Sequence, residues 1–246
     1  MPSALKRAKF QMLDELLAGL GGIDPSRICL DPPPGHATEK DLIRYLHQAD
    51  KRVFELVDRT LVEKPMGLKE SFLAAILIKL IGVYSDTHGD LGMVTSPDGP
   101  MKLFAGLVRF PDVAFVFWDR LPDRKVPTAP VPELAPDLAV EVLSESNTRA
   151  ELIRKRGEYF RAGVKLVWLV DPATRTACPI TSPDDFQELT DSDVLDGGEL
   201  LPDLRIPLAE LFDKLPSEPK NPPVAASGGG GIHATGQYAR LPRPMA

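Results

Sequence analysis

The stretch that decides the fold is residues 136–144, Pro-Asp-Leu-Ala-Val-Glu-Val-Leu-Ser. Apolar residues lie on both sides of Glu141, whereas a strand with one solvent-exposed face would alternate apolar and polar residues. The pattern therefore predicts a strand with both faces buried, as in a sheet that is covered by helices. Two more apolar runs, residues 113–118 and residues 164–170, have the same character.

A helix connects two of these strands. Residues 148–151, Thr-Arg-Ala-Glu, form a capping-box pattern that predicts the start of a helix, and Gly163 predicts its end. A strand, a helix and a second strand of this kind predict an α/β fold with a mixed central β-sheet flanked by helices.

The first half of the chain adds helices and short strands. An amphipathic helix over residues 3–19 is followed by a second helix that begins at Thr38, with Asp41 completing a weak capping box. The helix over residues 68–85 is apolar all round and should therefore be buried against a sheet. The other expected elements are a hairpin of residues 53–57 and 60–64 and short strands beside the turn at residues 96–99.

The composition is that of a globular protein with a separate tail. The chain has 246 residues, of which 26 % are charged, and its net charge of −6 argues against coating nucleic acid by bulk electrostatics. Two cysteines and no long apolar run predict a cytoplasmic protein without a membrane span. We expect an N-terminal helix and proline-rich connector (1–37), one folded domain (38–213) and a disordered tail (214–246).

Three acidic residues lie where apolar side chains are expected. Glu141 and Glu55 are each surrounded by apolar strand residues, and Asp112 directly precedes the run at 113–118. A buried carboxylate without a partner is costly, so something must compensate each of them. Either the three acids converge on one divalent cation, for which oxygen ligands suit Mg²⁺ or Mn²⁺, or they form buried ion pairs.

The predicted helix over residues 149–162 carries a candidate basic partner. At the helical period, Lys155 lies at one margin of the apolar face and Arg156 near its middle, so periodicity slightly favours Arg156 as the more buried residue. Chemistry favours the lysine, which can orient a metal-bound water and share a proton. Both side chains could equally reach solvent at the helix edge. The expected outward residues are Arg154, Glu158, Arg161 and Lys165, and the expected inward residues are Leu152, Ile153, Tyr159 and Phe160.

The negative charge of the chain is concentrated in one segment. Residues 184–199 contain seven acidic residues and no lysine or arginine, whereas residues 149–165 contain six basic residues and two acidic ones. The predicted helix can therefore attract phosphate even though the whole chain is acidic.

The order of these motifs resembles the Uma-type family of bacterial restriction endonucleases, in the PD-(D/E)XK nuclease superfamily, over about residues 40–212. The motifs that carry the resemblance are Pro111-Asp112-Val113-Ala114, the stretch 136–144, Lys155 four residues before Tyr159, Val167 to Pro172, and the hairpin segment from Glu55 to Glu63. The resemblance implies a restriction-endonuclease-like core and hydrolysis of phosphodiester bonds with Mg²⁺ as the cofactor, or Mn²⁺ in its place.

The resemblance also implies roles for individual residues. Asp112, Glu141 and the carbonyl of Val142 are the expected metal ligands, and Glu55 is an accessory acid that reaches the metal directly or through water. The lysine of the superfamily motif has moved to the following helix, so Lys155 is the expected catalytic lysine. The residues expected to contact phosphates of double-stranded DNA are Arg154, Arg156 and Arg161. The start of the helix at Thr148 is a further candidate phosphate contact, and a homodimer is left open by analogy with nucleases that cut both strands.

The sequence departs from the family pattern at a few positions outside the expected site. Arg59 stands where relatives have glycine, which leaves the turn type of the hairpin open. Pro179 interrupts the strand after Asp171, which predicts an edge strand.

Two other classes of function compete with the nuclease. The first is a catalytically silent protein that keeps the fold and binds nucleic acid or a partner. The second is a two-carboxylate glycosidase, which would be expected to have an aromatic sugar cleft, whereas aromatic residues are only 7 % of this chain.

Overall fold

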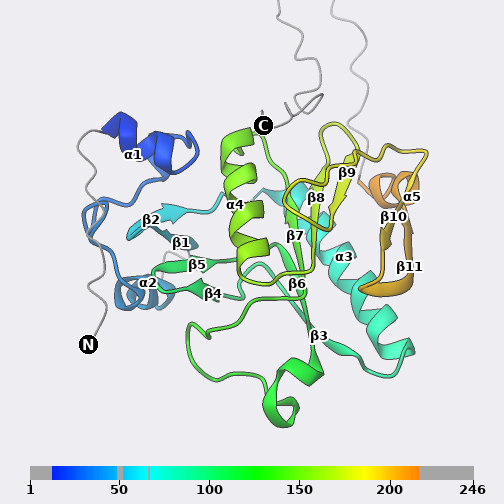
Figure 1. The fold of residues 1–246 in the computed structure, drawn as a ribbon. Coiled ribbons are helices and arrows are strands. Elements are labelled where there is room, and N and C mark those ends of the chain that lie inside the picture. The colour runs from blue at the N-terminus through cyan, green and yellow to red at the C-terminus, as the bar shows by residue number, and fades with distance from the viewer. Residues whose placement is uncertain (1–12, 49–51, 66, 216–246) are drawn as a thin grey trace, which may run out of the picture. The chain divides into compact units, whose positions relative to one another are not determined.

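The structure is a computed structural model that describes residues 13–48, 52–65 and 67–215 (Figure 1). The described residues belong to one compact unit. Residues 3–12 of the first predicted helix and the predicted disordered tail beyond residue 215 lie outside the described part, and the predicted domain boundaries stay predictions. Among the described helices, none has the length and apolar character needed to cross a membrane.

The central sheet has five strands in the order β3-β6-β7-β8-β9. Its strands are β3 Gly92–Thr95, β6 Val113–Phe117, β7 Leu138–Val142, β8 Leu166–Asp171 and β9 Thr176–Ile180. β7 and β8 run parallel and the other neighbours run antiparallel, so the predicted mixed sheet is confirmed. β9, which contains Pro179, lies at the sheet edge as predicted.

Two further sheets accompany the central one. A four-stranded antiparallel sheet has the order β2-β1-β5-β4, and a small sheet consists of β10 and β11. Their strands are β1 Phe54–Val57, β2 Thr60–Glu63, β4 Met101–Phe104, β5 Leu107–Arg109, β10 Val194–Gly197 and β11 Leu201–Pro207. The predicted hairpin is thus confirmed as β1 and β2. Its turn residues Asp58 and Arg59 have φ angles of 46° and 60°, so Arg59 adopts the conformation that favours glycine.

The described helices are α1 Leu13–Gly19, α2 Glu39–Leu46, α3 Leu68–Thr87, α4 Arg149–Arg161 and α5 Leu208–Phe212, with short 3₁₀ turns at Pro25–Arg27, Trp118–Arg120 and Pro122–Arg124. Helices α2, α3 and α4 begin where the sequence predicted, whereas the predicted start of the first helix lies outside the described residues and α5 was not predicted. Thr38 and Asp41 form the reciprocal capping box in front of α2. Thr148 caps α4 by accepting a hydrogen bond from the Glu151 backbone N–H.

Helix α3 covers one face of the central sheet, but it is not buried all round. Leu73, Leu77 and Ile81 pack into a core with Phe115 and Trp168. The opposite side of the helix is exposed, since its apolar side chains Leu68, Phe72 and Val83 are accessible to solvent. The expectation of burial is therefore right for one face only.

Helix α4 lies beside both larger sheets, with β1, β2, β4 and β5 to one side and β6 to β8 to the other (Figure 1). The side chains that it directs inward include Glu151, Lys155 and Glu158 as well as Leu152 and Tyr159. Two expectations about this helix are wrong, because Glu158 is buried and Ile153 is exposed. Hydrophobic periodicity failed here because the inward face carries charges that are neutralised by partners on the sheets.

Candidate active site

A small cavity lies at the carboxyl end of β7, where the central sheet meets α3 and α4. Its lining includes Asp112, Glu141 and Lys155, together with Lys64, Glu70 and Asn147. β6 and β7 are antiparallel with Val113 opposite Val140, so one step further along the register brings Asp112 beside Glu141. Two of the three acids singled out in the sequence thus face one cavity.

Asp112 is held by both of its carboxylate oxygens. The Val142 backbone N–H donates to Oδ2 at 2.7 Å, and the Lys64 ammonium lies 2.8 Å from Oδ1. Lys64 also donates a hydrogen bond to the carbonyl of Phe110. Asp112 is therefore fixed in orientation by one donor from its own sheet and one from the hairpin of the neighbouring sheet.

Glu141 is buried, and α4 supplies its partners. Lys155 Nζ lies 3.2 Å from Oε2, and the Tyr159 hydroxyl donates to Oε1 at 2.6 Å. Burial raises the pKa of Glu141, the positive charges of Lys155 and Lys64 oppose this, and the net pKa is above its ordinary value. Burial likewise raises the pKa of Tyr159, so that its hydroxyl stays a neutral donor.

Lys155 is more buried than Arg156, which settles the question that helical periodicity left open. Its side chain is only 3 % exposed, whereas that of Arg156 is partly accessible. Burial alone would lower the pKa of Lys155, but Glu141 and Glu55 outweigh it and hold this pKa above the ordinary lysine value. Lys155 is therefore a charged hydrogen-bond donor in the folded protein.

Glu55 lies behind the cavity and does not line it. Its side chain is fully buried, and its carboxylate contacts Arg109 Nη1 at 2.6 Å and Lys155 Nζ at 3.3 Å. Burial raises the pKa of Glu55, but the charges of Lys155 and Arg109 dominate and keep it below its ordinary value. In this arrangement Glu55 neutralises Lys155 and Arg109 from the protein interior.

Arg109 links Glu55 to helix α4. Its Nε and Nη2 donate to Glu158 Oε2 at 2.9 and 2.5 Å, in addition to the contact with Glu55. Arg109 stands in the apolar sequence Leu-Val-Arg-Phe, the same embedded pattern that singled out the acids, so the sequence carried a signal for it. Glu55 and Arg109 are each a charged residue within an apolar strand sequence, and two such residues of opposite charge together predict a buried ion pair.

The N-terminal segment covers the start of α4. Arg27 forms a two-bond ion pair with Glu151, with distances of 3.0 and 2.8 Å, and Thr148 donates a hydrogen bond to the Gly21 carbonyl. The backbone at Gly21 is so close that an added Cβ would lie 2.6 Å from the Glu151 Cα. The expectation that this helix start contacts phosphate is therefore not supported, because protein groups already occupy it.

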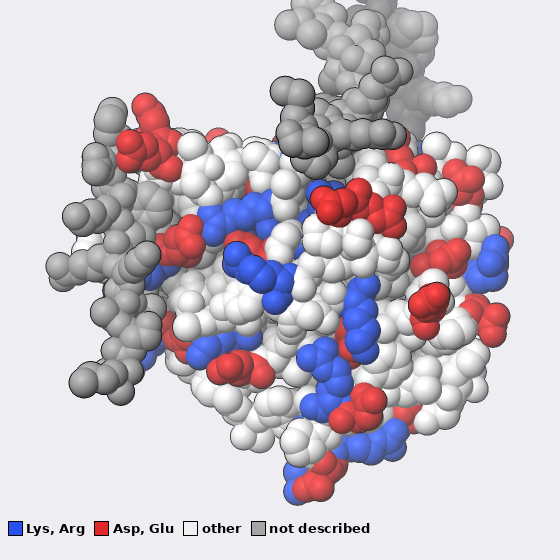
Figure 2. Space-filling view, in the orientation of Figure 1, with Lys and Arg blue, Asp and Glu red and all other residues white. Residues whose placement is uncertain are grey.

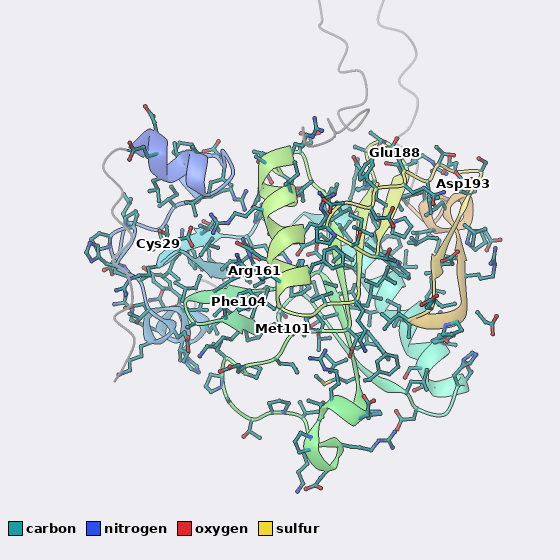
Figure 3. All side chains as sticks on the ribbon, in the orientation of Figure 1. Cys29, Met101, Phe104, Arg161, Glu188 and Asp193 are labelled. Atoms are coloured by element: carbon teal, nitrogen blue, oxygen red, sulfur yellow. The ribbon has the colours of Figure 1, made fainter. Side chains whose placement is uncertain are left out.

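The three arginines expected to bind phosphate occupy different surroundings. Arg154 is engaged by Asp58 at 2.8 Å and by Glu158 at 2.7 Å. Arg161 is exposed and its guanidinium carbon lies over the ring of Phe104, 4.9 Å from the centroid. Both residues are labelled in Figure 3. Figure 2 shows basic side chains in small groups, many beside acidic ones, and not as one basic patch.

The donor set of the cavity suits a hard divalent cation. Asp112 and Glu141 provide carboxylate oxygens, and the Val142 carbonyl lies at the same strand end. Mg²⁺ is often held by one or two carboxylates, with water and substrate phosphate completing its coordination. Over the described ranges, no cluster of three or more His, Cys, Asp or Glu side chains is arranged to hold a metal. Of the three acids singled out in the sequence, only Asp112 and Glu141 could hold a cation here, since Glu55 does not line the cavity.

Sequence reasoning missed three charged residues that line this cavity, of which Arg27 belongs to the 3₁₀ turn of the N-terminal segment. Lys64 follows the last strand residue of the hairpin, and Glu70 lies in the first turns of α3. Both lie in segments whose polar residues look like ordinary surface positions. Only the packing of α3 and the hairpin against the end of β7 brings them to the acids.

The fold and the cavity together define a protein of the restriction-endonuclease-like class. The crystal structure of a putative nuclease belonging to DUF820 from Anabaena variabilis ATCC 29413 is similar, with a TM-score of 0.61 and 17 % sequence identity. The match covers 70 % of this chain and 96 % of that one. The Uma2 family model, described as putative restriction endonuclease, matches residues 40–209, and the chain belongs to this family. No curated protein matches the chain.

Proposed function

We propose that this protein is a Mg²⁺-dependent endonuclease that hydrolyses phosphodiester bonds of double-stranded DNA, and that Mn²⁺ can replace Mg²⁺. The observation that carries the proposal is the shared cavity of Asp112, Glu141 and Lys155. The combination of two adjacent carboxylates with a charged lysine suits metal-assisted hydrolysis better than a glycosidase, which would need a free acid and a free base at the sugar.

The proposed ligands of the cation are Asp112, Glu141 and the Val142 carbonyl. When bound, the cation supplies Lewis acidity toward the phosphate and makes a coordinated water more acidic. The Val142 N–H keeps Asp112 oriented, and Tyr159 does the same for Glu141. Both contacts fix the carboxylates before a ligand arrives, so less ordering is needed on binding.

Lys155 acts as a donor in this proposal. Its raised pKa leaves the ammonium charged, so it orients the attacking water and stabilises negative charge on the phosphate. Glu55 balances the charge of Lys155 from the interior and holds the ammonium near Glu141. In this proposal Glu55 does not bind the metal directly. Its accessory role is to hold Lys155 in place, which its buried position supports.

The experiment is a cleavage assay on plasmid DNA, linear DNA and single-stranded RNA, with Mg²⁺, Mn²⁺ or EDTA. Asp112→Ala, Glu141→Ala and Lys155→Ala should each lower the rate at least 100-fold, in line with the loss of one key electrostatic group, estimated at about 10²–10³. Arg156→Ala, next to Lys155 but outside the cavity lining, is the matched control and should keep most of the activity.

Two outcomes would contradict the proposal. Cleavage that survives all three cavity substitutions would place the activity elsewhere or in a contaminant. A wild-type protein that binds DNA and the metal but never cleaves would support the catalytically silent alternative. Light scattering measures the oligomeric state, for which a homodimer was left open by analogy, and fractionation of host cells tests the expected cytoplasmic location.

A further inference from the structure

Lys64 is a buried lysine to which the proposed mechanism gives no task. It directly follows β2, its side chain is 6 % exposed, and it lines the same cavity as Asp112 and Glu141. Lys155 reaches the cavity from α4 on the central-sheet side, whereas Lys64 reaches it from the hairpin of the four-stranded sheet. The two carboxylates are thus accompanied by two ammonium groups that come from different parts of the fold.

The ion pair with Asp112 does not account for all the bonding capacity of Lys64. An ammonium group has three N–H donors. The described partners of Lys64 Nζ are the Asp112 carboxylate and the Phe110 carbonyl, which leaves one donor on a side chain that lines the cavity. Asp112 is also oriented by the Val142 N–H, so it has a second means of support.

A lysine beside Asp112 has opposite effects on the binding of the phosphate and on the binding of the divalent cation. Its positive charge attracts a phosphate that enters the cavity, and the same charge repels a divalent cation at Asp112. In the absence of ligands the ammonium neutralises Asp112, whose charge would otherwise be partly buried beside that of Glu141.

We propose that Lys64 is a phosphate-binding residue of this site, whose ammonium contacts a non-bridging oxygen of the nucleic-acid phosphate held beside Asp112 and Glu141. The inference rests on the proposed function, because it assumes that the cavity receives a phosphodiester. It assigns to Lys64 the substrate contact and leaves to Lys155 the orientation of water.

The test measures metal binding and DNA binding separately on the full chain with Lys64→Met, which keeps the length of the side chain and removes its charge. Metal affinity is measured by calorimetric titration with Mn²⁺ in the absence of DNA. DNA affinity is measured with Ca²⁺ in place of Mg²⁺, at several salt concentrations. We expect metal binding to tighten about tenfold, because a positive charge near the cation is removed. DNA binding should weaken about tenfold or more, because a charge-assisted hydrogen bond is lost.

The salt dependence of DNA binding reports the phosphate contact directly. Loss of one phosphate contact should lower the slope of log affinity against log salt by about 0.9. Lys64→Arg keeps the charge and should keep the wild-type slope. Lys102→Met is the matched control, because Lys102 is a partly buried, ion-paired lysine that does not line the cavity, and it should change neither affinity nor slope.

A purely structural Lys64 would give a different result. Metal binding and DNA binding would then stay unchanged or weaken together, the slope would stay at the wild-type value, and the inference would be overturned. If Lys64→Met does not fold, Lys64→Gln, which keeps a donor for the Phe110 carbonyl, takes its place. If the wild-type protein never cleaves, the proposed function alone is contradicted. If the wild type cleaves but Lys64→Met changes neither the metal affinity nor the DNA affinity as expected, only this inference is contradicted.

Discussion

Arg109 is the residue whose loss should disturb the protein interior most. It is 2 % exposed and makes three close contacts with two buried carboxylates, at 2.6 Å to Glu55 and at 2.9 and 2.5 Å to Glu158. Replacement by methionine would leave Glu55 with Lys155 and Glu158 with Arg154. Breaking a buried ion pair from one side costs about 3–5 kcal/mol, because the remaining charge stays buried.

We therefore expect Arg109→Met to lower the free energy of unfolding by about 3–5 kcal/mol. For a domain of this size the melting temperature should fall by about 6–20 °C, at about 2–4 °C for each kcal/mol. Urea unfolding followed by circular dichroism measures the free energy. A double-mutant cycle with Glu158→Gln should show a coupling of about 0.5–3 kcal/mol, since the two side chains are in direct contact.

Arg175→Met is the matched control for this prediction. Arg175 also contacts two carboxylates, Asp191 at 2.7 Å and Asp213 at 2.8 Å, but all three side chains are at least 37 % exposed. Exposed ion pairs contribute about 0–1 kcal/mol, so the variant should stay close to wild type. If Arg109→Met and Arg175→Met lower the free energy of unfolding equally, the argument that burial determines the size of the loss is refuted.

Three further predictions concern other parts of the molecule. Burial raises the pKa of Glu151, but its bond to a buried arginine outweighs this and lowers it, so Glu151→Gln should cost about 3 kcal/mol at pH 7. Urea unfolding at several pH values measures this loss of unfolding free energy. The loss should shrink as the pH falls below about 4.3, the ordinary glutamate pKa, and through the lower pKa of the folded state. A loss that does not change with pH would contradict the lowered pKa of Glu151. Gly21→Ala should destabilise the protein by more than about 2 kcal/mol in thermal unfolding, because positive φ and backbone contact act together, whereas Gly22→Ala, with positive φ and open space, should cost only about 1 kcal/mol. Burial raises the pKa of Cys178 to about 12, so at pH 8 a thiol reagent should label at most Cys29 in the native protein. Rapid labelling of Cys178 in the Cys29→Ser variant would contradict this prediction.

The central strands could be predicted from the sequence because their signal is local. The runs around Glu141 and over residues 164–170, which became β7 and β8, are apolar on both faces, and only a covered sheet accepts such strands. The capped starts of α2 and α4 were equally local, since a cap depends on residues three positions apart. These parts of the fold follow from neighbouring residues alone.

The inward face of α4 could not be predicted in the same way. Helical periodicity assumes that inward residues are apolar, and it therefore favoured Arg156 and Ile153 over Lys155 and Glu158 for burial. The structure reverses this order, because partners from β1, β5 and β7 neutralise the charged side chains. Resemblance to a family identified Lys155, whereas the pattern predicted the β1–β2 hairpin but not the pairing of β5, which carries Arg109, with β1 in a separate four-stranded sheet.

The inward charges of α4 also constrain how this sequence can change over time. Glu55 and Glu158 each contact two basic residues, and Arg109 and Lys155 each contact two acids, so these four positions form one chain of shared partners. A substitution at one of them removes one of the two counter-charges of a neighbour, whichever position changes first. Replacement in descendants of this protein should therefore occur in compensating pairs, and the positions should co-vary more strongly than the apolar residues around them.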